Sequence, residues 1–469
     1  MKQTDKTTLT NQVKIMFKKF TAAFMAMLIA IAGGLLASGT AYALPSFARQ
    51  TGMQCSSCHA VFPTLNAFGR SFKLRGYTLG SALEDKQFPE NLPLTVGLQI
   101  SDTSVKDRYK GADPAGDFPQ SNKPIVQLLG LYYGGKIAGN VGTFAQYNWD
   151  GIEKQWKAEM VDVRYADSAT TGGKELLYGV TVSNAPSIED VWNTSGMWAF
   201  PHIGNAGIMP MQTSLLDSMT LGNQVGNVGL YGFYDNQFYA EIGFLRNGKN
   251  GIFRALNSGV QLDTAINGNA PHLRLAWEKN WDSNSFMIGG NAVRADIFPD
   301  AAVQSGLTDR FTDVMLDSQY QYDNGDRQFS LTASYDREKR SWDASKPAMN
   351  ASNASDNLNT FKLSGHYWYQ RKIGGGIGIF DYRGDTDPMK YGMGGMGAAS
   401  AMGNASGSPD ARGWIAEANW LPLENRQNVK LGLRYTAYTK FNGASSNYNG
   451  AGRDASDNNS LFAYVWMLY

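Results

Sequence analysis

The residues whose spacing most directly indicates chemistry are Cys55-Ser56-Ser57-Cys58-His59. The two thiols of a C-x-x-C-H motif are spaced to form thioether bonds with the two vinyl groups of one haem. The histidine that follows them is an axial ligand of haem iron in such sites. The motif therefore predicts one covalently bound haem c, attached through Cys55 and Cys58, with His59 as its axial metal ligand.

Other uses of paired thiols fit this chain less well. It has only two cysteines, both in the motif, which excludes a disulfide framework and a four-cysteine zinc site. A thioredoxin-like redox pair needs a surrounding βαβ pattern, and the neighbouring residues do not have one. A chance C-x-x-C is the remaining alternative to haem attachment.

Residues 1–43 predict a secretory signal peptide that is removed. Three lysines (14, 18 and 19) precede an apolar run over 20–36, and Ala41-Tyr42-Ala43 offers an A-x-A cleavage site. Glycines within the run disfavour a transmembrane anchor. The remainder of the chain has 37 basic and 40 acidic side chains, a near-neutral balance that gives no support for nucleic-acid binding.

A short cytochrome segment is predicted over residues 44–92, with one amphipathic helix after the motif. Leu65, Phe68, Phe72 and Arg75 recur there at helical spacing. Fewer than fifty residues rarely build an independent core, so we expect this segment to use the rest of the chain as walls around a haem.

From about residue 93 onward, apolar and polar side chains alternate at period two, which predicts an all-β architecture. About sixteen strands of roughly ten residues fit the sequence, the length that a tilted membrane strand needs. The expected strands are 93–101, 124–134, 140–149, 157–166, 174–182, 226–234, 236–245, 271–279, 285–296, 311–322, 328–339, 358–370, 374–383, 412–421, 427–438 and 460–469.

The connections between these strands are long and short in turn, with the gap after residue 149 as the exception. Such alternation, together with 23 Tyr, 11 Trp and 52 Gly, is typical of outer-membrane barrels and has no reason to persist in a soluble sandwich. We therefore predict that residues 93–469 form a porin-like transmembrane β-barrel in the outer membrane, in contact with its lipid. An even strand number brings the cytochrome segment in from the periplasmic side, where it plugs or caps the lumen.

The second axial ligand of the haem is not assigned by the sequence. Strand phase places His272 and His366 on the lumen side, where polar residues are the rule. Met160 shares that phase, and methionine is another haem ligand. The other candidates are His202, in the longest loop, and Met53, which is close to the motif in the chain.

The N-terminal motifs resemble the fused outer-membrane cytochrome–porin family. The resemblance is carried by the run from Ser46 to Gly52, the C-x-x-C-H motif, Pro63, and the segment Phe68-Gly69-Arg70 with Phe72-Lys73 and Gly76-Tyr77. It implies a monohaem cytochrome segment joined to a barrel, and for members from iron oxidisers it implies transfer of electrons from extracellular Fe(II) to a periplasmic cytochrome. Only Cys55, Cys58 and His59 carry over as functional residues.

Three functions are compatible with these observations. The first is electron transfer from extracellular Fe(II) through one haem to a periplasmic carrier, an oxidoreductase-type activity whose status as an enzyme stays open. The second is a transport channel with a haem-bearing plug or redox-sensitive gate. The third is an electron conduit with another donor, such as a reduced sulfur compound or a solid. No Ser/His/Asp set or nucleotide-binding motif supports hydrolase or nucleotide chemistry.

Overall fold

A computed structural model of the chain describes residues 46–61, 64–78, 94–106, 124–185, 190–195, 210, 212–217, 221–249, 251–392, 402–423 and 428–469. The predicted signal peptide lies outside these residues, as does the end of the predicted cytochrome segment. Leu44–Tyr469 is one compact unit by its contacts. Within the described parts, no helix is long and apolar enough to cross a membrane.

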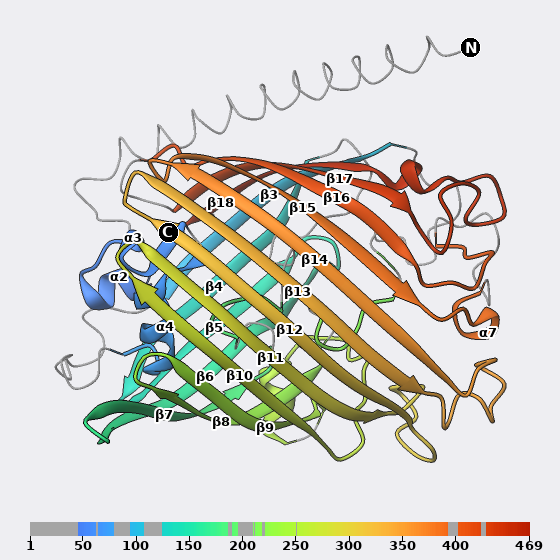
Figure 1. Cartoon of the computed structure of the whole chain (residues 1–469), viewed down its shortest axis with the longest axis horizontal. Helices are drawn as coiled ribbons and strands as arrows, with labels where there is room; N and C mark the ends of the chain where they lie inside the picture. Colours follow the sequence, from blue (N-terminus) through green and yellow to red (C-terminus); the bar gives the residue numbers. More distant parts are fainter. Residues whose placement is uncertain are drawn as a thin grey trace, which may run out of the picture. The chain divides into compact units, whose positions relative to one another are not determined.

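Sixteen antiparallel strands close into a barrel, which confirms the predicted fold class and strand number. The final strand pairs with the first strand of the barrel, in register from Ser460↔Val105 to Leu468↔Gly97. Figure 1 shows the steep tilt of the strands across the barrel. The strands are β3 Leu94–Val105, β4 Ile125–Ala138, β5 Val141–Asp150, β6 Gln155–Thr171, β7 Lys174–Ser183, β8 Val225–Tyr234, β9 Phe238–Asn247, β10 Asn269–Trp281, β11 Asn284–Ile297, β12 Asp309–Asp323, β13 Arg327–Ser341, β14 Ser355–Tyr369, β15 Ile373–Gly384, β16 Ala411–Trp420, β17 Val429–Lys440 and β18 Ser460–Leu468.

The barrel is apolar outside and polar inside. Leu230, Ile242 and Leu316 are 59%, 65% and 62% exposed on the outer face, whereas Arg274 and Glu278 are buried on the inner face. An outward apolar surface on a closed barrel is the arrangement that lipid requires, because closure leaves no unpaired strand edge. The chain is therefore a membrane-spanning barrel of the outer-membrane type.

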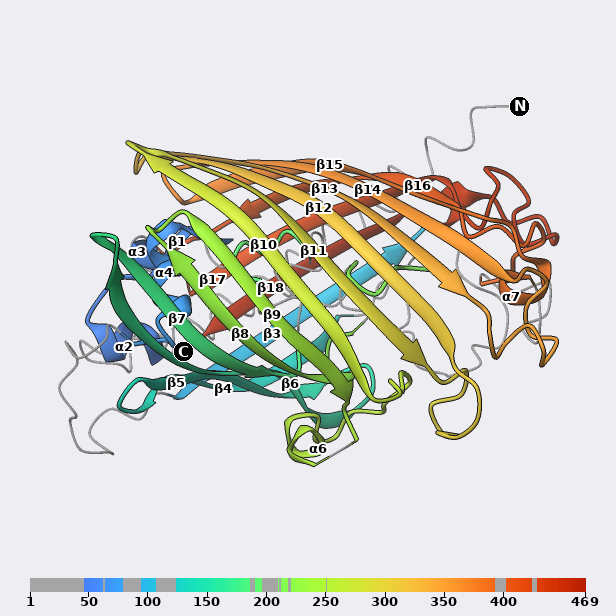
Figure 2. The same cartoon turned by 60° about the horizontal axis from the view of Figure 1, so that its bottom comes forward.

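Short turns and long connections lie at opposite ends of the barrel, except for the short connection 151–154 between β5 and β6, which lies at the end of the long ones. We call the end with short turns, such as Gly172–Gly173 and Asp235–Asn236, the turn end, and the opposite end the loop end. The N-terminal helices α2 (Ser46–Thr51), α3 (Cys55–Cys58) and α4 (Ala67–Leu74) lie at the turn end with the C-terminus, and α7 (Pro388–Tyr391) lies at the loop end (Figures 1 and 2). The loop end also carries α6 (Ile252–Leu256) and the 3-10 helix η2 (Ala455–Asn458).

The N-terminal segment is built from short elements that contact the barrel. They are α2 Ser46–Thr51, α3 Cys55–Cys58, β1 His59–Val61, β2 Thr64–Leu65 and α4 Ala67–Leu74. The Ser46 amide donates to Oγ1 of Thr95 on β3, at 2.8 Å. The Lys136 amide at the end of β4 donates to the side chain of Gln50, at 3.1 Å.

The predicted helix after the motif is confirmed as α4, but its buried face differs from a simple apolar one. Phe72 is buried as expected, while Phe68 is 42% exposed and Leu65 lies in β2, before the helix begins. Leu74, which is not among the expected residues, is also buried. Arg70 and Lys73 are buried instead. The reason is that α4 packs against the polar inner wall of the barrel, where charged side chains find partners.

Candidate functional site: the N-terminal segment in the lumen

The C-x-x-C part of the motif forms the single helical turn α3, and His59 follows it in extended conformation. Cys55 and Cys58 lie three residues apart in the turn, a spacing that puts both side chains on one face of a helix. His59 caps the turn, and its N–H bonds to the Cys55 carbonyl. Burial, followed by the nearby Cys55, raises the pKa of Cys58 to about 11, so this thiol stays protonated at neutral pH.

This donor set fits covalent attachment of a haem better than a metal site. Two thiols one helical turn apart with a histidine next in the chain match the two vinyl groups and the iron of one haem. Across the described ranges, no group of three or more His, Cys, Asp or Glu is placed to hold a metal ion.

Asn66 and Gly69 pack α4 tightly against α3. The Asn66 amide donates to the Cys58 carbonyl at 2.9 Å, and its side-chain amide donates to the Ser57 carbonyl at 3.0 Å. The same side chain accepts the Gly69 N–H at 2.9 Å and so caps α4. A Cβ on Gly69 would lie 2.1 Å from the Cys58 carbonyl oxygen, so no other residue fits without movement of the backbone.

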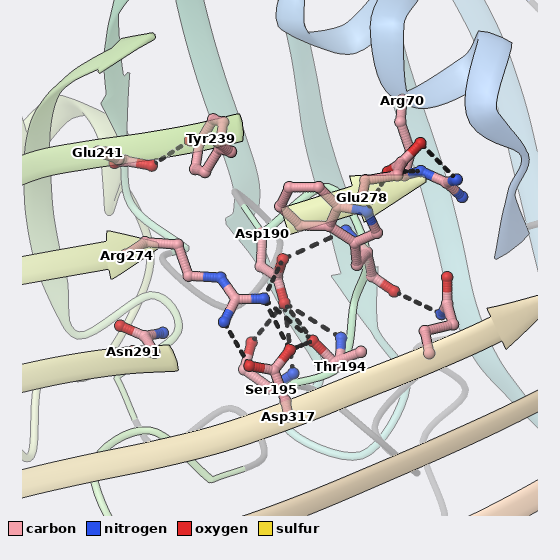
Figure 3. A network of polar contacts seen from close by, with 12 residues as sticks. Arg70, Asp190, Thr194, Ser195, Tyr239, Glu241, Arg274, Glu278, Asn291 and Asp317 are labelled. Carbon is pink, nitrogen blue, oxygen red and sulfur yellow. Dashed lines mark hydrogen bonds and ion pairs between the residues drawn. The ribbon is translucent and has the colours of Figure 1, made fainter. Parts of the chain in front are cut away.

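Arg70 anchors α4 to the barrel wall. Its guanidinium donates to both carboxylate oxygens of Glu278 on β10, at 2.9 and 3.0 Å, and to the side chain of Gln321 on β12 at 2.7 Å. Both partners of the ion pair are buried. Figure 3 shows Arg70 reaching from α4 to Glu278. A paired bidentate contact of this kind offsets the cost of burying the two charges.

The described part of the long connection between β7 and β8 folds into the lumen. The indole N–H of Trp192 donates to the same Glu278 carboxylate that holds Arg70. Asp190, two residues earlier, forms an ion pair with Arg274 on β10, which in turn pairs with Asp317 on β12. Figure 3 shows this network beside the Arg70–Glu278 pair.

A second contact region in the same connection reaches the wall formed by β12–β14. The Leu215 and Leu216 amides donate to Glu338 and Asp313, each at 2.8 Å. Asp217 pairs with Lys362 on β14. The described residues of the β7–β8 connection therefore lie inside the barrel, against the wall formed by β10–β14.

The end of the N-terminal segment is also fixed to the barrel. The Tyr77 hydroxyl donates to Asp162 on β6, which also pairs with Arg164. The Tyr231 hydroxyl on β8 donates to the Leu74 carbonyl at 2.6 Å. Together with Arg70, these contacts fasten the described part of the segment to β6, β8, β10 and β12.

The structure separates the candidate distal ligands by position. His272 and His366 face inward as predicted, but His272 lies at the loop-end half of β10, where its Nε2 is 2.8 Å from Oδ1 of Asn291. His366 lies three residues before the turn end of β14, the end that carries α3. Met160 is buried against Ala185, and Met53 is half-buried near the motif. His202 lies outside the described residues.

Two arginines that follow the motif in the chain, Arg70 and Arg75, form ion pairs with the barrel. Arg75 donates to both carboxylate oxygens of Glu175 on β7, at 2.9 and 2.7 Å, as Arg70 does to Glu278. The Arg49 side chain lies outside the described set. Arg70 and Arg75 therefore serve as anchors, a role that sequence reasoning missed because their partners lie 208 and 100 residues away.

No protein-family model matches the sequence, and no curated protein matches it. Solved structures with a similar fold include OmpF of Salmonella typhi in complex with daunomycin, at 11% identity and TM-score 0.45, covering 80% of this chain and 97% of that one. The outer membrane channel DcaP of Acinetobacter baumannii has 10% identity and TM-score 0.42, over 80% and 96%. OmpT of Vibrio cholerae has 11% identity and TM-score 0.40, over 80% and 96%. Likenesses at this level carry no argument about function.

Proposed function

We propose that this chain is an outer-membrane electron-transfer protein with one haem c on Cys55 and Cys58 and His59 as an axial ligand. One observation carries the proposal: the C-x-x-C-H turn is packed on a segment that ion pairs fasten inside a closed barrel. The donor is extracellular Fe(II), by resemblance to the cytochrome–porin family, and the acceptor is a soluble periplasmic electron carrier. The haem segment enters from the periplasmic side.

The chain's own residues hold and surround the redox group. When bound, the haem supplies one-electron chemistry, and the protein sets its potential through ligand, burial and charge. Each Fe(II) loses one electron and remains outside as Fe(III), and the carrier gains that electron. The inward β7–β8 residues and the Arg70–Glu278 anchor restrict passage through the lumen, so iron stays on the outer side while the electron crosses.

A transport channel is the second candidate, and the closed barrel on its own supports it better than electron transfer. Sixteen strands enclose a lumen wide enough for small solutes. In this case the N-terminal segment is a plug or a redox-sensitive gate. A conduit that takes electrons from another donor is a further form of the first function.

Two measurements on purified protein separate these functions. Haem-specific staining after denaturing electrophoresis tests covalent attachment, with a C55A/C58A variant as the control. Reduction of the haem band by Fe(II), and its reoxidation by a soluble c-type cytochrome, is the expected result for electron transfer. A haem that stays oxidised under excess Fe(II), together with swelling of liposomes in small sugars, would overturn it in favour of a channel.

A further inference from the structure

A strained turn at the turn end of the barrel touches the haem motif. The hairpin between β14 and β15 is a tight turn in which Lys372 N–H bonds to the Tyr369 carbonyl at 3.0 Å. Its two central residues, Gln370 and Arg371, both have φ of +52°. That conformation favours glycine, asparagine or aspartate and is costly for a long side chain.

Two other hairpins of the barrel have the same positive φ at both central residues but use suitable residue types. They carry Gly172–Gly173 and Asp235–Asn236. Of these three turns, only the one beside the motif has long side chains at the two positions with positive φ. A residue kept in an unfavourable conformation points to a constraint outside the turn itself.

The constraint is visible in the contacts of the Arg371 guanidinium. Its Nη1 donates to the carbonyls of Ser56 and His59, each at 3.1 Å. Its Nη2 donates to both carboxylate oxygens of Asp323 at the end of β12, at 2.9 and 2.7 Å. One side chain thus joins two barrel hairpins to the motif turn.

We propose that Arg371 is a positioning residue for the axial-ligand end of the haem motif, with Asp323 holding its guanidinium in place. The inference rests on the proposed haem attachment. The end of a helix leaves backbone carbonyls without hydrogen-bond donors, and here the Arg371 guanidinium donates to the carbonyls of Ser56 and His59. Asn66 takes up those at Ser57 and Cys58, so the four carbonyls from Ser56 to His59 are all fixed. The direction of the His59 imidazole then depends on the barrel.

The test uses the variants R371G, R371Q and D323N in the full chain. R371G removes the side chain and also relieves the strain, so the barrel is expected to stay at least as stable, measured by its heat-modifiable mobility in electrophoresis. The matched control is R383Q, which removes another arginine–aspartate pair on β15, with Asp381, whose arginine is exposed.

The first readout needs no haem. Thiol labelling of the refolded haem-free chain is expected to be about three- to tenfold faster in all three variants than in the unaltered chain or R383Q, because the motif turn loses its anchor. The second readout is the axial-ligand signature of the haem protein in near-infrared and paramagnetic resonance spectra, which is expected to change in the same way in all three variants.

Unchanged labelling in R371G would overturn the proposal. The proposal would also be overturned if the axial-ligand signature stayed unchanged while the reduced fraction of haem moved in opposite directions in R371Q and D323N. Arg371 and Asp323 would then act on the haem only through their charges and would not position the motif. The two proposals can also fail separately. If the chain never acquires covalent haem but thiol labelling is still faster in the variants, the anchoring of the motif turn is upheld and the proposed function is rejected.

Discussion

Arg70 on α4 and Glu278 on β10 form a buried bidentate ion pair across 208 residues of sequence. The same carboxylate accepts the indole N–H of Trp192 from the β7–β8 connection. Glu278 is therefore the point at which the barrel wall, the N-terminal segment and the inward connection meet (Figure 3).

Removing one partner of this pair is expected to release the N-terminal segment without unfolding the barrel. E278Q leaves the Arg70 guanidinium buried and uncompensated, at a cost of about 3 kcal/mol. The check is proteinase K digestion in detergent, in which the N-terminal segment of E278Q is cut faster while the barrel resists. The double variant R70M/E278Q, which buries neither charge, should recover most of the protection. R310Q, at an exposed ion pair with Asp296, should change nothing. Equal digestion of E278Q and the unaltered chain would contradict the anchoring role.

Enlarging Gly69 is expected to lower the yield of covalent haem. A Cβ at this position lies 2.1 Å from the backbone oxygen of Cys58, so α3 and α4 must move apart, at about 1–3 kcal/mol. The measurement is haem stain per unit of folded barrel for G69A. G365A is the control, because the nearest atom to its added Cβ is a Leu331 side-chain carbon at 3.8 Å. Equal haem yield in G69A and G365A would show that the close packing is unimportant.

Replacing the barrel histidines is expected to give unequal results. His366 lies three residues from the turn end of β14, roughly 10 Å along the strand, whereas His272 lies nine residues from that end of β10, roughly 30 Å. H366A should therefore disturb a six-coordinate haem spectrum, and H272A should not. A six-coordinate spectrum that survives in both variants would leave His202, Met160 and Met53 as the candidate distal ligands.

The loop end has a pH dependence of defined sign at Asp387. Burial alone would raise the pKa of this carboxyl, but the backbone N–H groups of Asn353, Ser352 and Lys390 lower it below its usual 3.8. A depressed folded pKa adds stability above the unfolded value of about 3.8 that is lost as pH falls through the folded value. D387N should therefore expose this loop to protease at pH 5–7, and its difference from the unaltered chain should shrink below about pH 3.8. A difference that grows on acidification would reverse the assigned sign.

The sequence alone was sufficient to predict the β-barrel and to identify the C-x-x-C-H motif. The strand expected over 328–339 is Arg327–Ser341, and the strand expected over 285–296 is Asn284–Ile297. Alternation at period two is a local signal, and a membrane strand must show it because one face meets lipid and the other the lumen. The attachment motif is local as well, since its five residues are consecutive in the chain.

Only the tertiary structure decided what fills the lumen. Helical spacing grouped Phe68 with Phe72, yet Phe68 is exposed and Arg70 is buried, because the carboxylate that receives Arg70 belongs to a strand 208 residues later. The inward course at Trp192 and the contact of Arg371 with the motif likewise depend on partners brought close by barrel closure. Ion pairs between residues far apart in the chain produce no periodic pattern in the sequence. The residues that anchor the N-terminal segment can therefore be identified only in the closed barrel of sixteen strands.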